Sequence, residues 1–73
     1  MYLIKRTITY LANGKTESMY LKNSHVFNRF VSDRSAAKEY YRKKDALADL
    51  RKAKQRDASA AKYELIFEHT TNK

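Results

Sequence analysis

The chain has 73 residues, with 16 Lys or Arg against 8 Asp or Glu, which gives a formal net charge of +8. It contains no cysteine, which excludes disulfide bonds and thiolate metal sites, and no apolar run long enough to span a membrane. The hydrophobic fraction of 42% is that of a globular chain rather than a disordered one. We expect a single domain over residues 1–69, a flexible tail over residues 70–73 and a cytoplasmic location in a bacterial host.

The N-terminal part of the chain has the pattern of a β-hairpin. Apolar and polar residues alternate over residues 2–10 and again over residues 18–22, which is the period of a strand with one buried face. Asn13-Gly14 lies between them and contains the only glycine of the chain. This pair is favoured in two-residue type I′ turns, because both turn positions need positive φ. The sequence therefore predicts two antiparallel strands joined by a two-residue turn.

Such a turn also predicts the register of the hairpin. With Asn13-Gly14 as the loop, Tyr10 lies opposite Glu17 and Ile8 lies opposite Met19. The residues that then share one face of the sheet are Ile8, Tyr10, Met19 and Leu21. This agreement between turn and apolar pattern supports the hairpin.

The segment that follows the hairpin fits two structures. Val26–Val31 is rich in apolar residues and is either a short third strand, which we favour, or an irregular crossing that fills the core. Asp33 is then suited to cap a short helical turn over residues 34–38. Because no glycine or proline separates this turn from the next helix, one continuous helix over Arg34–Arg56 is an alternative.

The second half of the chain predicts one main helix and one strand. From Lys44 to Arg56 the apolar residues recur at helical spacing and form a stripe of Ala46, Leu47, Leu50 and Ala53. Strand-like alternation returns over residues 62–68, which we expect to be the last strand. The predicted fold class is α+β: a small antiparallel sheet of N-terminal hairpin, short middle strand and C-terminal strand, packed on one main helix.

Four short patterns occur in order along the chain. They are Tyr2-x-Ile4-Lys5, Asp33-x-x-x-Ala37-x-x-Tyr40, Lys43-Lys44-Asp45-Ala46 and Tyr63-Glu64-Leu65. In this arrangement the chain resembles short uncharacterised phage and prophage proteins of Gram-positive bacteria. The resemblance implies a break near Tyr40-Tyr41, with these tyrosines in a short strand between two helices. It implies no functional residues.

No pattern in the chain is typical of catalysis or of a cofactor site. His25 and His69 have no second His, Cys or carboxylate at metal-ligand spacing, so we expect no metal. A chain with one glycine has neither a phosphate-binding loop nor the turn that presents a nucleophilic serine. We therefore predict a protein that is not an enzyme and that binds no cofactor.

Basic residues gather on the predicted main helix. On a helical wheel, Lys44, Arg51 and Gln55 fall on one ridge, away from the apolar stripe. A ridge of this kind binds a phosphate backbone by releasing condensed counterions, and Gln55 adds a contact to a base or sugar. The alternative is a lysine-rich face that only keeps the protein soluble.

A second candidate surface is the outer face of the hairpin. In the predicted register, Tyr20 and Lys22 point away from Met19 and Leu21, on the side that also carries Lys5. An exposed aromatic ring among lysines can stack on an unpaired base. Together the two surfaces give the candidate contact residues for a nucleic acid or an acidic partner, which are Arg42, Lys43, Lys44, Arg51, Lys54, Gln55, Tyr20 and Lys22.

Two functions follow from these features. The first is a prophage accessory protein that binds a macromolecular partner, with another protein favoured as that partner. The second is a nucleic-acid-binding protein that uses the basic helix ridge. The last strand is able to pair across a dimer, but the sequence leaves the oligomeric state open.

Overall fold

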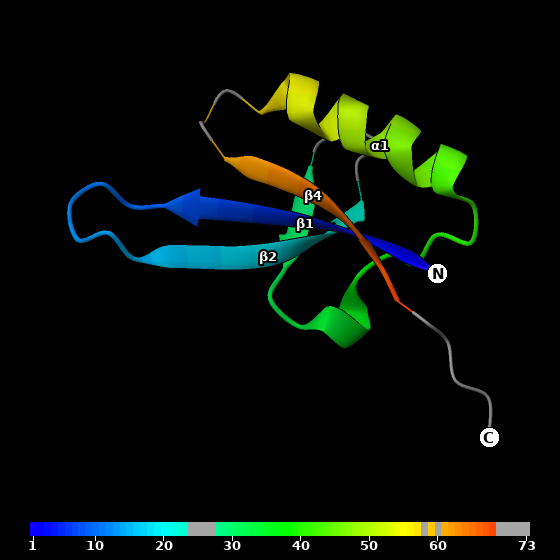
Figure 1. The fold of residues 1–73 in the computed structure, drawn as a ribbon, viewed down its shortest axis with the longest axis horizontal. Helices are drawn as coiled ribbons and strands as arrows, with labels where there is room; N and C mark the ends of the chain where they lie inside the picture. Colours follow the sequence, from blue (N-terminus) through cyan, green and yellow to red (C-terminus); the bar gives the residue numbers. More distant parts are fainter. Residues whose placement is uncertain (24–27, 58, 60, 69–73) are drawn as a thin grey trace.

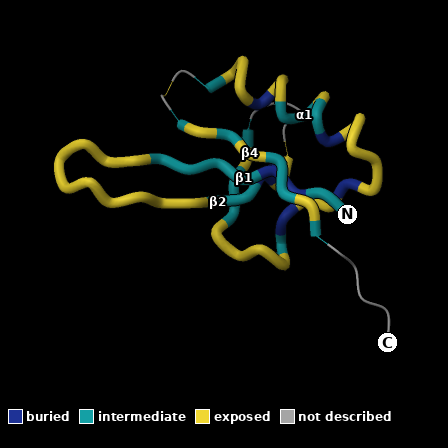
Figure 2. Tube along the Cα trace, viewed as in Figure 1, coloured by how far each residue is buried: buried dark blue, intermediate teal, exposed yellow. Residues whose placement is uncertain are grey.

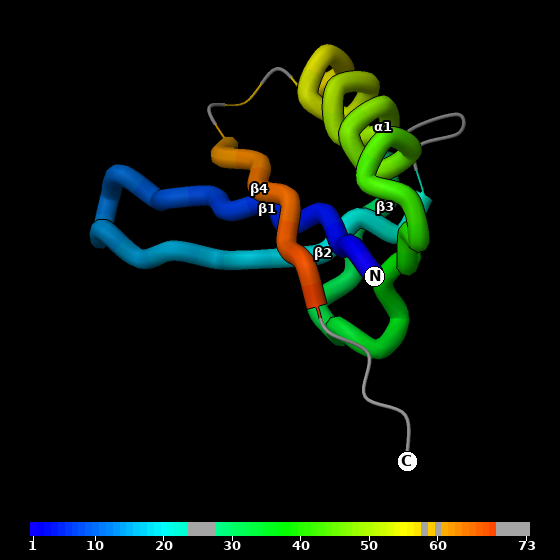
Figure 3. Tube along the Cα trace, turned by 45° about the vertical axis from the view of Figure 1, so that its right-hand side comes forward, coloured from blue at the N-terminus to red at the C-terminus, as the bar shows by residue number. Residues whose placement is uncertain are grey.

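The computed structural model of the chain describes residues 1–23, 28–57, 59 and 61–68. Within them, four strands form one antiparallel sheet in the order β3-β2-β1-β4. The elements in chain order are β1 (Tyr2–Thr9), β2 (Thr16–Asn23), β3 (Arg29–Val31), the short 3-10 helix η1 (Arg34–Ala36), α1 (Lys43–Arg56) and β4 (Lys62–Phe67). Helix α1 and η1 lie on opposite sides of the strands (Figures 1 and 3). The predicted α+β class, with a small antiparallel sheet packed on one main helix, is confirmed.

The turn of the hairpin differs from the predicted two-residue turn. The Tyr10 N–H donates to the Lys15 carbonyl oxygen at 2.8 Å, so residues 11–14 form a longer loop. Gly14 has a φ of 68°, whereas no non-glycine residue described has a positive φ, and a type I′ turn is therefore wrong. The Asn13 side chain accepts a hydrogen bond from the Lys15 N–H at 2.9 Å. This bond holds Asn13 without the strain of a left-handed conformation.

The longer loop shifts the register by two residues. Ile8 lies opposite Glu17 rather than Met19, and Met19 lies opposite Arg6. Because side chains alternate with a period of two, a shift of two leaves every side chain on its predicted face. The predicted cross-strand partners were wrong, but the predicted assignment of side chains to the two faces of the hairpin is correct.

The predicted middle strand is present in part. Residues 29–31 form β3, which pairs with β2 through Tyr20 opposite Val31 and Leu21 opposite Phe30. Residues 26 and 27 of the predicted strand lie outside the described residues, as does the predicted tail over residues 70–73. The sheet therefore has the short middle strand that we favoured.

A short extended segment separates η1 from α1. The Tyr40 N–H donates to the Tyr2 carbonyl oxygen at 2.9 Å, and the Tyr2 N–H donates to the Tyr40 carbonyl oxygen at 2.7 Å. The Lys38 N–H donates to the Leu21 carbonyl oxygen at 3.1 Å. Residues 38–40 thus bond to both β1 and β2. The alternative prediction of one continuous helix over Arg34–Arg56 is therefore wrong. Lys38 and Tyr40 form backbone hydrogen bonds to the sheet instead of helical ones.

The main core lies between α1 and the sheet face that carries Ile4 and Leu21, both of which are fully buried. Helix α1 contributes Ala46 and Ala53, which are also fully buried. Because alanine is small, the helix backbone approaches the strands closely. Leu50 is half-buried and packs against the same cluster.

The carboxylate of Asp57 fixes the C-terminal end of α1 to the sheet. It accepts hydrogen bonds from Arg6 Nε of β1 at 2.7 Å and from the Tyr63 hydroxyl of β4 at 2.6 Å. The backbone N–H and the hydroxyl of Ser59 donate to its other oxygen at 2.9 and 2.6 Å. The Arg6 guanidinium also lies 4.9 Å from the centre of the Phe30 ring. Both oxygens of Asp57 are therefore held by three segments of the chain.

The hydrogen bonds to Asp57 determine the ionisation state of its carboxyl group. Burial opposes the charged form of Asp57, but the hydrogen bonds from Arg6, Ser59 and Tyr63 outweigh it and hold the pKa of this carboxyl below its usual range. The side chains of Arg6 and Asp57 are only 16% and 10% exposed, so solvent screens this pair little. The ionised carboxylate is the form that stabilises the fold.

We expect Asp57→Asn to lower the free energy of unfolding at neutral pH by about 1.5–3 kcal/mol, because hydrogen bonds to a charged group are lost. The folded-state pKa lies below the unfolded value of about 4, so this stabilisation is present above pH ~4 and is lost as the pH falls below it. Urea denaturation from neutral pH to about pH 3 should show the wild type losing stability on acidification and approaching the variant.

Asp45→Asn is the matched control, because Asp45 is an exposed aspartate of the same helix. It should shift the unfolding free energy by less than about 1 kcal/mol. Equal effects of the two substitutions would contradict a structural role for the Asp57 carboxylate.

Candidate functional site

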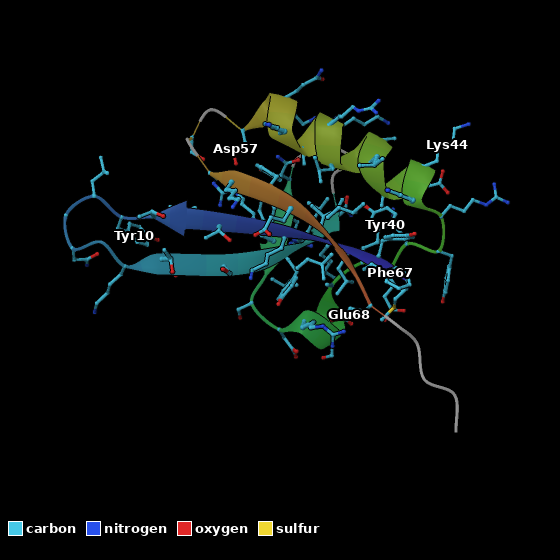
Figure 4. All side chains as sticks on the ribbon, in the orientation of Figure 1. Tyr10, Tyr40, Lys44, Asp57, Phe67 and Glu68 are labelled. Carbon is cyan, nitrogen blue, oxygen red and sulfur yellow. The ribbon has the colours of Figure 1, made fainter. Side chains whose placement is uncertain are left out.

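Helix α1 presents one strongly basic face to solvent. Six of its fourteen residues are Lys or Arg, and Arg42 precedes the helix as its N-cap residue. All of these cations are exposed, and the set is Arg42, Lys43, Lys44, Arg51, Lys52, Lys54 and Arg56. The outer side of α1 is exposed along its length (Figure 2), and Lys44 extends from its first turn away from the strands (Figure 4). The buried alanines of the opposite face hold this basic face outward.

The two aspartates of α1 reduce this charge unequally. Asp49 is half-buried and accepts a hydrogen bond from the Tyr40 hydroxyl at 2.6 Å, with Lys38 Nζ at 3.5 Å. Burial and the contact with Asp49 raise the pKa of Tyr40, so its hydroxyl remains a donor. Asp45 is exposed and lies in the first turn, where a carboxylate favours the helix dipole. The face therefore keeps a large excess of positive charge.

The structure places the predicted contact residues on two separate surfaces. Six of them lie on or beside α1 and are exposed, namely Arg42, Lys43, Lys44, Arg51, Lys54 and Gln55. Tyr20 and Lys22 belong to β2 and point to the face of the sheet opposite α1, because Leu21 between them is in the core under the helix. No single flat ligand surface includes both groups.

The hairpin surface is also less open than expected. Leu3, which lies on the same face as Tyr20, is only 1% exposed, and Tyr20 itself is half-buried. This end of the face is covered on the side where η1 packs against β2. Lys22 is exposed, but the aromatic ring predicted to stack on a base is partly covered. The basic face of α1 is therefore the stronger candidate site.

The structure adds residues that the sequence analysis did not select. A groove of about 590 Å³ runs beside the N-terminal half of α1. Its lining includes Tyr41, the cations Lys38, Arg42 and Lys52 and the acids Glu39, Asp45 and Asp49. Tyr41 is 83% exposed, which is unusual for an aromatic ring. The resemblance implied that Tyr40 and Tyr41 share one short strand, yet Tyr40 is 5% exposed and in the core. Tyr40 differs from Tyr41 in its backbone pairing with Tyr2 of β1. No periodicity in the sequence predicts this pairing.

The remaining predictions concern metals and membranes. Among residues 1–23, 28–57, 59 and 61–68, no cluster of three or more His, Cys, Asp or Glu side chains is suited to hold a metal ion. In the same part of the chain, no helix is long and apolar enough to cross a membrane. His25 and His69 lie outside the described residues.

Comparison with known proteins adds nothing to these observations. The chain matches no protein-family model, no curated protein and no solved structure. The functional interpretation therefore depends on the geometry and the charge of the chain itself.

Proposed function

We propose that this chain is a non-enzymatic protein that binds nucleic acid through the basic face of α1. The observation that carries the proposal is the exposure of every Lys and Arg side chain on a helix with six of them in fourteen residues. Clustered cations on one helix face are the electrostatic signature of phosphate-backbone binding. Each phosphate that such a face neutralises releases counterions, which drives association at low salt.

The spacing along α1 supports contacts to several phosphates. With a rise of 1.5 Å per residue, Lys44 and Arg51 lie about 10 Å apart along the helix axis. Gln55 extends the same ridge by about 6 Å, and its amide is able to contact a base or sugar. A row of this length spans several nucleotides of a single strand or lies across the backbone of a duplex.

Tyr41 favours an unpaired strand over a duplex. Its ring is exposed and lies beside Arg42 and Lys52 in the groove next to α1, whose lining also includes Glu39, Asp45 and Asp49. Proteins that bind single strands combine such cations with aromatic rings, on which unpaired bases stack. A duplex keeps its bases stacked on one another and offers Tyr41 no partner.

The role of the basic face is tested by Lys44→Glu combined with Arg51→Glu. Fluorescence-anisotropy titrations with labelled duplex DNA, single-stranded DNA and RNA at about 50 and about 200 mM salt should show binding by the wild type that weakens steeply with salt. The variant should bind far more weakly and lower the salt slope by about 2, because two phosphate contacts are lost.

Lys15→Glu combined with Lys22→Glu is the matched control, since it changes the charge equally but away from α1. It should retain most of the affinity. Loss of binding in this control but not in the α1 variant would move the site to the hairpin surface. No binding by the wild type at the lower salt concentration would contradict the proposal and make the charge a solubility feature.

The preference for single strands is tested by Tyr41→Ala. Loss of one stacked base should weaken single-strand binding by about 1–3 kcal/mol and leave duplex binding almost unchanged. Tyr41→Phe keeps the ring and should bind as the wild type does. An equal effect of Tyr41→Ala on both substrates would exclude stacking as the role of this ring.

A protein partner is the second candidate, and the tip of the hairpin favours it. Leu11 is 98% exposed and Tyr10 beside it is 45% exposed, on a hairpin that extends well beyond the rest of the sheet (Figure 1). An exposed leucine beside a partly exposed tyrosine offers apolar contact area to a protein partner. A prophage accessory role in a bacterial cytoplasm, as the sequence resemblance implies, is compatible with either partner.

A further inference from the structure

The groove beside the N-terminal half of α1 contains both signs of charge. Its volume of about 590 Å³ is within the range of pockets that hold small molecules. Three acids and three cations are among the described residues that line it, namely Glu39, Asp45, Asp49, Lys38, Arg42 and Lys52. Because these charges balance, the groove attracts a phosphate less than the ridge of Lys44 and Arg51 does. It is therefore suited to an uncharged polar group, such as a nucleobase.

The groove lies directly beside the basic ridge of α1. Asp45 and Lys52 line the groove and follow Lys44 and Arg51 by one position each, or about 100° around the helix. Tyr40, which also lines the groove, lies on the opposite side of α1 from Lys44 (Figure 4). A strand whose phosphates contact the ridge is therefore able to place one base in the groove.

The two aspartates of the groove differ in their capacity to accept further hydrogen bonds. Asp49 Oδ2 accepts a bond from the Tyr40 hydroxyl at 2.6 Å and lies 3.5 Å from Lys38 Nζ. Asp45 is exposed, and in the part of the chain that the structure describes no side chain bonds to its carboxylate. Both oxygens of Asp45 are thus available to a ligand.

Guanine is the base whose hydrogen-bond donors match such a carboxylate. Its N1–H and its N2 amino group are adjacent and parallel, so they donate to the two oxygens of one carboxylate, as a guanidinium group does. Adenine and cytosine each have an amino group next to a ring nitrogen that is an acceptor, and this nitrogen repels the second oxygen. Uracil and thymine have one N–H between two carbonyl oxygens and no amino group. A carboxylate with two available oxygens therefore favours guanine.

We propose that the groove binds guanine in a single strand, with the base stacked on Tyr41 and its N1–H and N2 amino group donating to the Asp45 carboxylate. Lys52, which lines the same groove, is a donor for the guanine O6 atom next to N1. This inference rests on the proposed binding of single strands through α1 and adds a base preference to it. Stacking accepts every base, so Tyr41 supplies affinity and Asp45 supplies the preference.

Strands that differ in one kind of base test the preference. Labelled strands of about ten nucleotides, in which thymidine alternates with a variable base, are titrated by anisotropy at about 50 mM lithium chloride, which does not support guanine quadruplexes. The strand with guanine should bind about five- to tenfold more tightly than the strands with cytosine or with thymine alone. Hypoxanthine lacks only the N2 amino group of guanine, so the strand that contains it should lose most of this gain.

Asp45→Asn tests the role of the carboxylate. The amide has one acceptor oxygen, and its amino group opposes the guanine donors, so the preference for guanine over thymine should disappear. Glu64→Gln is the matched control, because it removes the same charge from an exposed residue that lies opposite Lys5 on the face of the sheet away from α1. It should keep the wild-type ratio of the two affinities.

The possible failures of the two proposals are distinguishable. A wild-type chain that binds all these strands equally well overturns the guanine preference and leaves binding through α1 intact. Loss of the preference in Glu39→Gln but not in Asp45→Asn overturns the assignment to Asp45. A wild-type chain that binds none of the strands overturns both proposals.

Discussion

The carboxylate of Asp57 is the contact on which the arrangement of the molecule depends. It lies directly after α1 and accepts bonds from Arg6 of β1 and from Tyr63 of β4, which are opposite each other in the sheet. A single group therefore fixes the end of the helix over the boundary between two strands. In a chain this small, in which the core contains few large side chains, such a bond contributes a sizeable share of a marginal stability. The buried Ala46 and Ala53 determine which side of α1 faces the sheet, and hence that the basic side faces solvent.

Three of the acidic residues bond to groups of the fold other than the Lys and Arg side chains of α1. Asp57 holds Arg6, Asp49 bonds to Tyr40 and Glu68 pairs with Arg34, so each of these carboxylates serves the fold. Only Asp45 is an exposed acid on α1. Seven of the sixteen Lys and Arg residues of the sequence thus lie exposed on or beside α1. A localised face is what phosphate binding needs, whereas solubility would be served by any distribution of the same charge.

The sequence predicted those features that depend on local periodicity. The two hairpin strands, the last strand and α1 were predicted to within two residues at each end, and the faces of the hairpin were correct because side-chain alternation survives a shift of two. The turn was wrong, since Asn13 bonds its own backbone through its side chain instead of adopting positive φ. Tyr40 and Tyr41 have adjacent positions and identical side chains, yet one is buried and the other is exposed. The difference arises because Tyr40 forms backbone hydrogen bonds with Tyr2, which is 38 residues away in the sequence. Pairing between such distant residues leaves no pattern in the neighbouring sequence.

The close packing of Ala46 and Ala53 against the sheet explains why Leu47 lies at the edge of the contact between α1 and the sheet. A helix seated on Ala46 and Ala53 lies low over β1 and β4, and the larger Leu50 fills the space beside Leu65. Leu47, on the other flank of the helix, remains only half-buried. The periodicity of the sequence assigned Leu47 and Leu50 to one stripe; both are half-buried, and Leu50 is the one that packs against the core cluster of described residues.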